Sequence, residues 1–131
     1  MVEREITLVA ERDRLLPSTK YAGFAGEHLA TRLLFQIPEE WIVDESLQYY
    51  VAYQTATGRR YRTENLHWPI ETTLPQAVTR AGKLFVQLNA VKILEDDTQL
   101  VKSASCTLII GPSIVGQYED CLLYTSPSPR D

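Results

Sequence analysis

The sequence predicts an all-β domain, an antiparallel immunoglobulin-like β-sandwich of about seven strands. Apolar and polar residues alternate along several short stretches, as they do when one face of a strand is buried. Proline, glycine and acidic clusters separate these stretches at the spacing typical of sandwiches, and no stretch carries the longer period of an amphipathic helix. With 131 residues, 44% of them hydrophobic, the chain fits one domain with a single core.

The first third of the chain contains two predicted strands and the connection between them. Residues 3–10 place Ile6 and Leu8 on one side of a short strand. Residues 11–27 are predicted to be irregular, because a proline, a serine and two glycines interrupt any regular element. Residues 28–37 alternate and end at a proline, which favours a strand, although a helix also suits their leucine, alanine and arginine residues. One face of this strand carries Leu29, Thr31, Leu33, Phe35 and Ile37.

The middle third is predicted to hold a loop, a hairpin and a short strand. Residues 38–48 indicate a loop or a single turn around Trp41. Residues 49–66 give the clearest hairpin signal, because tyrosines alternate along the first strand and Gly58 supplies the turn. Residues 70–75 predict a short strand that ends at a proline.

The last third is predicted to contain a helical turn and two long strands. Residues 75–82 suit one helical turn stopped by Gly82. Residues 83–93 have the strongest period of two, residues 94–99 form an acidic turn, and residues 100–112 form the final strand. The apolar faces of the two strands consist of Leu84, Val86, Leu88 and Ala90, and of Ala104, Cys106, Leu108 and Ile110.

The charge and composition argue against several classes of partner. A net charge of −4 gives no positive field that would draw the chain to nucleic acid or to an anionic membrane. No apolar run approaches the roughly 20 residues of a membrane span. The charged N-terminus lacks the apolar segment of a secretory signal, so synthesis in a cytoplasm is expected. Cys106 and Cys121 are therefore predicted to be free thiols.

No residue pattern predicts a catalytic, cofactor or metal site, and we expect the chain not to be an enzyme. Residues 111–116 resemble a nucleophile elbow around Ser113, but the glycine spacing is wrong and no helix follows. Histidines and carboxylates lack ligand spacing, and the acidic loops are expected to be solvated. Paired carboxylates for glycoside hydrolysis remain an open alternative. The residues considered were His28, His67, Glu39, Glu40, Asp44, Glu45, Glu95, Asp96 and Asp97.

Aromatic residues concentrated in one third of the chain are candidates for binding. On a sheet face they could stack on sugar rings or contact another protein, and the alternative is that every second one fills the core. Burial is favoured for Tyr49 and Tyr53, and the two alternatives are evenly balanced for Tyr50 and Tyr61. The full set is Trp41, Tyr49, Tyr50, Tyr53, Tyr61 and Trp68. The neighbouring Arg59, Arg60 and Arg62 are expected to protect a sheet edge.

Three stretches together resemble a known family. They are residues 35–41 (FQIPEEW), residues 49–66 (YYVAYQTATGRRYRTENL), and residues 73–91 (TLPQAVTRAGKLFVQLNAV) with the following KSASCTLIIGPSI. Their order resembles the N-terminal sandwich module of structural proteins of tailed phages and prophages of Gram-positive bacteria, in baseplate upper proteins, tail fibres or head fibres.

The resemblance covers most of residues 1–120 and transfers no ligand motif. It implies a virion protein made in the host cytoplasm, other virion subunits as partners, and a symmetric homo-oligomer, a trimer or a hexamer. A carbohydrate-binding β-sandwich that recognises host-surface glycans is the alternative hypothesis.

The C-terminal segment sets the expected domain boundaries. We expect a sandwich module over residues 1–115 and the start of a linker at residues 116–120. Residues 121–131 (CLLYTSPSPRD) resemble the translation of a transposase end and adapter used for sequencing libraries, and a disordered serine-proline tail is the alternative. On the adapter interpretation Cys121 is not native, and the chain is an N-terminal fragment of a longer protein.

Overall fold

The computed structural model describes residues 2–112, and the regular secondary structure of this part of the chain is almost entirely β. It contains nine strands, one short α-helix and one 3-10 turn, which confirms the predicted all-β class. The elements are β1 (Arg4–Glu11), β2 (Arg14–Pro17), β3 (Tyr21–Phe24), β4 (Thr31–Gln36), α1 (Glu39–Ile42), β5 (Leu47–Gln54), β6 (Arg60–Arg62), β7 (Ile70–Thr73), η1 (Gln76–Val78), β8 (Gly82–Ile93) and β9 (Thr98–Gly111).

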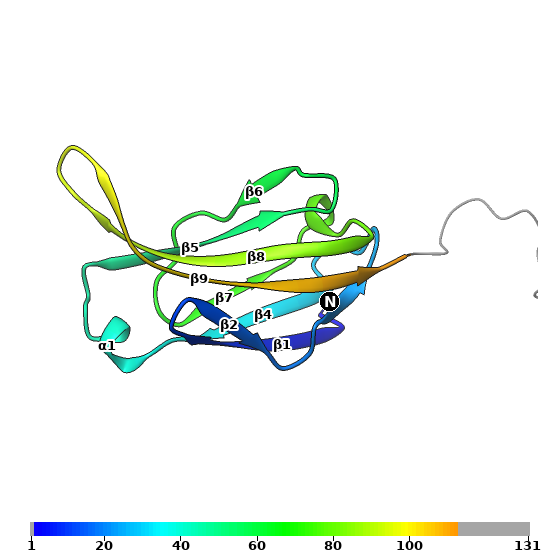
Figure 1. Ribbon diagram of the computed structural model, residues 1–131, viewed down its shortest axis with the longest axis horizontal. Helices are drawn as coiled ribbons and strands as arrows, with labels where there is room; N and C mark the ends of the chain where they lie inside the picture. The colour runs from blue at the N-terminus through cyan, green and yellow to red at the C-terminus, as the bar shows by residue number, and fades with distance from the viewer. Residues whose placement is uncertain (1, 113–131) are drawn as a thin grey trace, which may run out of the picture.

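All nine strands belong to one mixed sheet that curls over itself. The strand order is β6-β5-β8-β9-β2-β1-β4-β7, and β3 also pairs with β9. Figure 1 shows β5, β8 and β9 lying above β4 and β1, with the long β8–β9 hairpin projecting beyond the body of the domain. The apolar faces of the two halves meet in a single core. No helix within the described residues is long and apolar enough to cross a bilayer.

The predicted antiparallel immunoglobulin-like arrangement is not confirmed. Seven of the strands lie where the sequence predicts them, but β1 pairs with β4 in parallel, and β2 and β3 are both parallel to β9. The prediction that residues 11–27 are irregular is wrong, because β2 and β3 lie there. Arg12, at a φ of 60°, turns the chain back so that β2 pairs with β1. After β2, the chain runs beside β9 as β3 and then crosses to the other side of β1, where β4 pairs with it. Because the chain crosses over and does not turn back in a hairpin, β3 is parallel to β9 and β4 is parallel to β1.

The core follows the predicted alternation. In β8 the side chains of Leu84, Val86, Leu88 and Ala90 are fully buried. The facing layer contributes Leu33 and other alternate residues of β4 and β1. The predicted strand over residues 28–37 is shorter than expected, because Leu29 has a φ of 58° and its side chain is exposed.

A hydrogen-bonded ion pair holds the segment that follows β3. Arg4 Nη1 lies 2.7 Å from Glu27 Oε1 and 2.9 Å from Thr31 Oγ1. Glu27 Oε1 also accepts a hydrogen bond from the backbone N–H of Phe24 at 2.6 Å. The Arg4 hydrogen bond holds the pKa of Glu27 below its ordinary value, against the opposing effect of burial. The Arg4–Glu27 pair therefore connects β1 to the turn between β3 and β4.

Ser113, Cys121, the predicted linker at residues 116–120 and the predicted tail at residues 121–131 lie outside the described residues. The predicted end of the module at residue 115 lies there as well.

Candidate interaction surfaces

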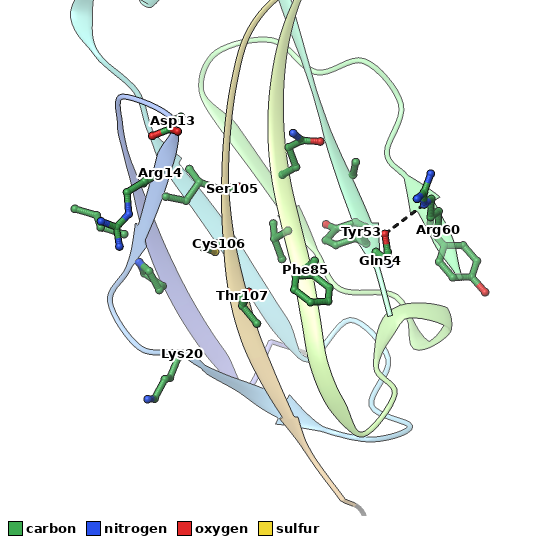
Figure 2. Close-up of a pocket in the computed structure, with 17 residues that line it drawn as sticks. Asp13, Arg14, Lys20, Tyr53, Gln54, Arg60, Phe85, Ser105, Cys106 and Thr107 are labelled. Atoms are coloured by element: carbon green, nitrogen blue, oxygen red, sulfur yellow. Dashed lines mark hydrogen bonds between the residues drawn. The ribbon is translucent and has the colours of Figure 1, made fainter. Parts of the chain in front are cut away.

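An open hollow crosses the solvent-facing side of β6, β5, β8 and β9 and ends against β2. It has a volume of about 1060 Å³. We call it the outer groove, and the residues that define it are Arg14, Lys20, Gln54, Arg60, Phe85 and Thr107. Figure 2 shows Arg14 and Lys20 along one wall, Arg60 at the opposite wall, and Phe85 and Thr107 on the floor between them.

Strand alternation creates the floor of this groove. Phe85 and Gln87 alternate along β8 with the fully buried Leu84, Val86 and Leu88, so their side chains point away from the core. The Phe85 side chain is 45% exposed, which is high for an aromatic ring near the middle of a sheet. An exposed ring among amide and hydroxyl groups suits contact with a partner.

The groove is basic although the whole chain is acidic. Its lining carries the cations Arg14, Lys20 and Arg60 against one carboxylate, that of Asp13. Among the described residues, none of these three cations forms an ion pair. Arg60 Nε donates only to the side-chain oxygen of Gln54, at 3.3 Å. The groove therefore presents positive charge to any molecule that enters it.

The second candidate surface is the projecting end of the β8–β9 hairpin, residues 91–101, which we call the hairpin arm. Its turn at residues 94–97 contains Glu95, Asp96 and Asp97 and is closed by backbone hydrogen bonds between Leu94 and Asp97. This confirms the predicted acidic turn. The arm also exposes four large apolar side chains, those of Ile93 (50%), Leu94 (47%), Leu100 (56%) and Val101 (37%).

The arm lacks a neighbouring strand along one edge within the described residues. The first β9 residue that pairs with β2 is Ser105, so residues 98–104 pair with β8 alone. A two-stranded ribbon of this kind has little stability of its own in water. The sequence could not indicate the exposed apolar residues, because the same alternation would also fit a buried hairpin.

The structure separates the predicted aromatic candidates rather than gathering them. Trp41, Tyr49 and Tyr53 are buried in the core, and burial raises the pKa of both tyrosine hydroxyls. Tyr50 is half-buried beneath the Arg62 guanidinium, whose carbon lies 3.7 Å from the ring centre. These residues therefore do not form one aromatic platform.

Two of the remaining candidates lie at the surface. Tyr61 is half-buried and lines the outer groove, and Trp68 is 42% exposed away from the groove lining. Arg60 and Arg62 lie on β6, which is an edge strand as predicted.

The remaining titratable candidates do not converge. Within residues 2–112 no group of three or more histidine, cysteine or acidic side chains could hold a metal ion. His28 Nδ1 accepts a hydrogen bond from the backbone N–H of Gln76 at 3.0 Å, and the His67 side chain is exposed. Asp44 accepts hydrogen bonds from Ser46, which lower its pKa, and it pairs with Lys92 at 3.4 Å.

Cys106 borders the outer groove but packs against the core, and its thiol should react slowly. Burial raises the pKa of Cys106 to about 11, so little thiolate is present at pH 8. A Cys121→Ser variant leaves Cys106 as the reacting thiol. Its reaction with a disulfide reagent at pH 8 should be about 100-fold slower in the folded protein than in guanidinium chloride, because unfolding returns the thiol to its ordinary pKa. Absorbance of the released thiolate measures both rates. Equal rates would contradict the burial of Cys106.

Comparison with known proteins gives a match at the level of fold. No protein-family model and no curated protein matches the sequence. Among solved structures, the N-terminal domain of phage TP901-1 ORF48 superposes with a TM-score of 0.56. The chain shares its fold with a phage domain. The match covers 85% of this chain and 99% of the phage domain, at 12% sequence identity.

Proposed function

We propose that this chain is a non-enzymatic structural and attachment module of a phage or prophage tail, baseplate or fibre protein. The observation that carries the proposal is the fold shared over almost the whole length of the TP901-1 ORF48 domain. The family resemblance of three sequence stretches points to the same class independently. In this proposal the protein is part of a virion, and its partners are other virion subunits and further copies of itself.

The surface of the domain supports an attachment role. A projecting arm with four exposed apolar side chains and a basic groove are both suited to contact with protein. A symmetric arrangement of three or six copies would match the symmetry of a virion tail.

A glycan-binding role is the second candidate, and one observation favours it. Phe85 lies in the groove beside the side chains of Gln54, Gln87 and Thr107. Aromatic faces can stack on sugar rings, while amides and hydroxyls can bond their hydroxyl groups. In this hypothesis glycans bind in the outer groove, and not on the set of tyrosines and tryptophans that the sequence indicated.

Immunogold electron microscopy tests the main proposal. Antibodies raised against the recombinant protein should label virions from a culture that carries the gene, at one fixed position on the particle. A culture from which the gene has been deleted supplies the control. Intact, fully assembled virions that carry no label, with the protein found only in the particle-free fraction, would exclude a virion role.

A further inference from the structure

We propose that copies of this chain associate through an arm-in-groove contact, in which the hairpin arm of one copy lies in the outer groove of another. This inference rests on the proposed function, because repeated copies in a virion bring the two surfaces together. The inference adds to the proposed function the two surfaces through which the copies would contact each other.

Charge complementarity is the first argument. The arm presents Glu95, Asp96 and Asp97 at its exposed turn, and none of the three forms an ion pair within the described residues. The groove presents Arg14, Lys20 and Arg60, which are likewise unpaired there. The three carboxylates of the protruding turn are opposite in sign to the groove, where three cations outnumber the single carboxylate of Asp13. Such matching guides encounter and excludes wrong partners.

Apolar contact is the second argument. Ile93, Leu94, Leu100 and Val101 are between 37% and 56% exposed, although a solvated turn needs no large apolar side chains. The groove offers the half-exposed ring of Phe85 on its floor. Burying these groups against one another would supply the hydrophobic part of the interface, with the charges around it. The contact would also order a ribbon that has little stability alone.

The geometry of the two surfaces fits a repeating assembly. The arm projects beyond the body at one end of the long hairpin, whereas the groove lies across the middle of the sheet (Figures 1 and 2). Because the arm and the groove are different surfaces, each copy can act as donor to one neighbour and as acceptor to another. Contacts of this heterologous kind give a ring, such as a trimer or a hexamer, when the rotation between neighbouring copies closes, and an open filament when it does not.

Charge reversal on each surface tests the contact, with molar mass measured by light scattering on the full chain. The arm variant carries Glu95→Lys, Asp96→Lys and Asp97→Lys, and the groove variant carries Arg14→Glu and Arg60→Glu. We expect an oligomer for the unchanged protein, and association weakened about 100-fold in each variant. A control with Glu39→Lys and Glu40→Lys, two exposed carboxylates on α1, should keep the oligomer.

Mixing the two variants gives the decisive result. The lysines of the arm variant face the glutamates of the groove variant, and the remaining arm and groove keep their original charges. An equimolar mixture should therefore assemble into pairs or even-numbered rings in which the two variants alternate, although neither variant assembles alone. Circular dichroism spectra and cooperative thermal unfolding of each variant, compared with the unchanged protein diluted until it is monomeric, show that loss of assembly is not loss of fold.

Three outcomes would overturn the proposal. They are a monomeric unchanged protein at high protein concentration, an oligomer that survives both reversals, and a mixture that stays monomeric. If a monomer binds anionic glycans on an array and the groove variant does not, the groove belongs to a glycan. Virion labelling separates this failure from failure of the proposed function, because it does not depend on self-association in solution.

Discussion

Replacing Leu88 by alanine should lower the free energy of unfolding by about 3–4 kcal/mol. Leu88 is fully buried at the middle of β8, where it lies opposite Val51 of β5 and Ala104 of β9. The truncation leaves a cavity between the two halves of the curled sheet. The backbone around it cannot move in to fill the cavity, because β8 is hydrogen-bonded to a strand on each side. Urea denaturation followed by circular dichroism measures the loss, and the melting temperature should fall by roughly 10–20 °C.

Gln87→Ala is the matched control for this prediction. Gln87 is the next residue on the same strand, and its side chain is exposed in the outer groove. This substitution should change the free energy of unfolding by no more than about 0.5 kcal/mol. Equal losses for Leu88→Ala and Gln87→Ala would mean that the face of β8 assigned to the core is wrong.

The strands that the sequence predicts are those with enough alternation to identify a buried face. β8 and β9 are 12 and 14 residues long, so the period of two repeats several times in each. β2 and β3 are four residues long, and each buries a single side chain, Leu15 and Ala22 respectively. One buried residue defines no period. Their pairing with β9 depends on long-range contact, which also decides that the sheet is mixed.

The sequence predicts only part of the candidate surfaces, because long-range strand pairing brings some of their residues together. Alternation correctly places Phe85 on the face opposite Leu84, and the sequence draws attention to Arg60 on a sheet edge. Arg14 and Lys20 join them only because β2 lies beside β9, and nothing local in the sequence indicates this. Tyrosine composition drew attention to side chains that the core uses. Exposed aromatic residues on the outer faces of long strands would have been a better signal.

Gly23→Ala should lower the free energy of unfolding by about 2–4 kcal/mol, from two separate causes. Gly23 has a φ of 119°, which residues with a side chain rarely adopt. A β-carbon at this position would also overlap Glu27 Oε1 and would lie 2.5 Å from Arg4 Nη1. The ion pair that connects β1 to the β3–β4 turn would therefore have to move. Thermal and urea denaturation of the variant measure the combined cost.

Gly26→Ala separates the two causes. Gly26 also has a positive φ, of 89°, but a β-carbon there would meet no atom within 4 Å. Only the backbone conformation is then strained, and the cost should be about 1–2 kcal/mol. In a background that carries Arg4→Ala and Glu27→Ala, the overlap at Gly23 is largely removed, so the two glycine substitutions should become nearly equal in cost. If they are already equal in the unchanged protein, the Arg4–Glu27 pair does not constrain the turn, and backbone strain alone explains the requirement for Gly23.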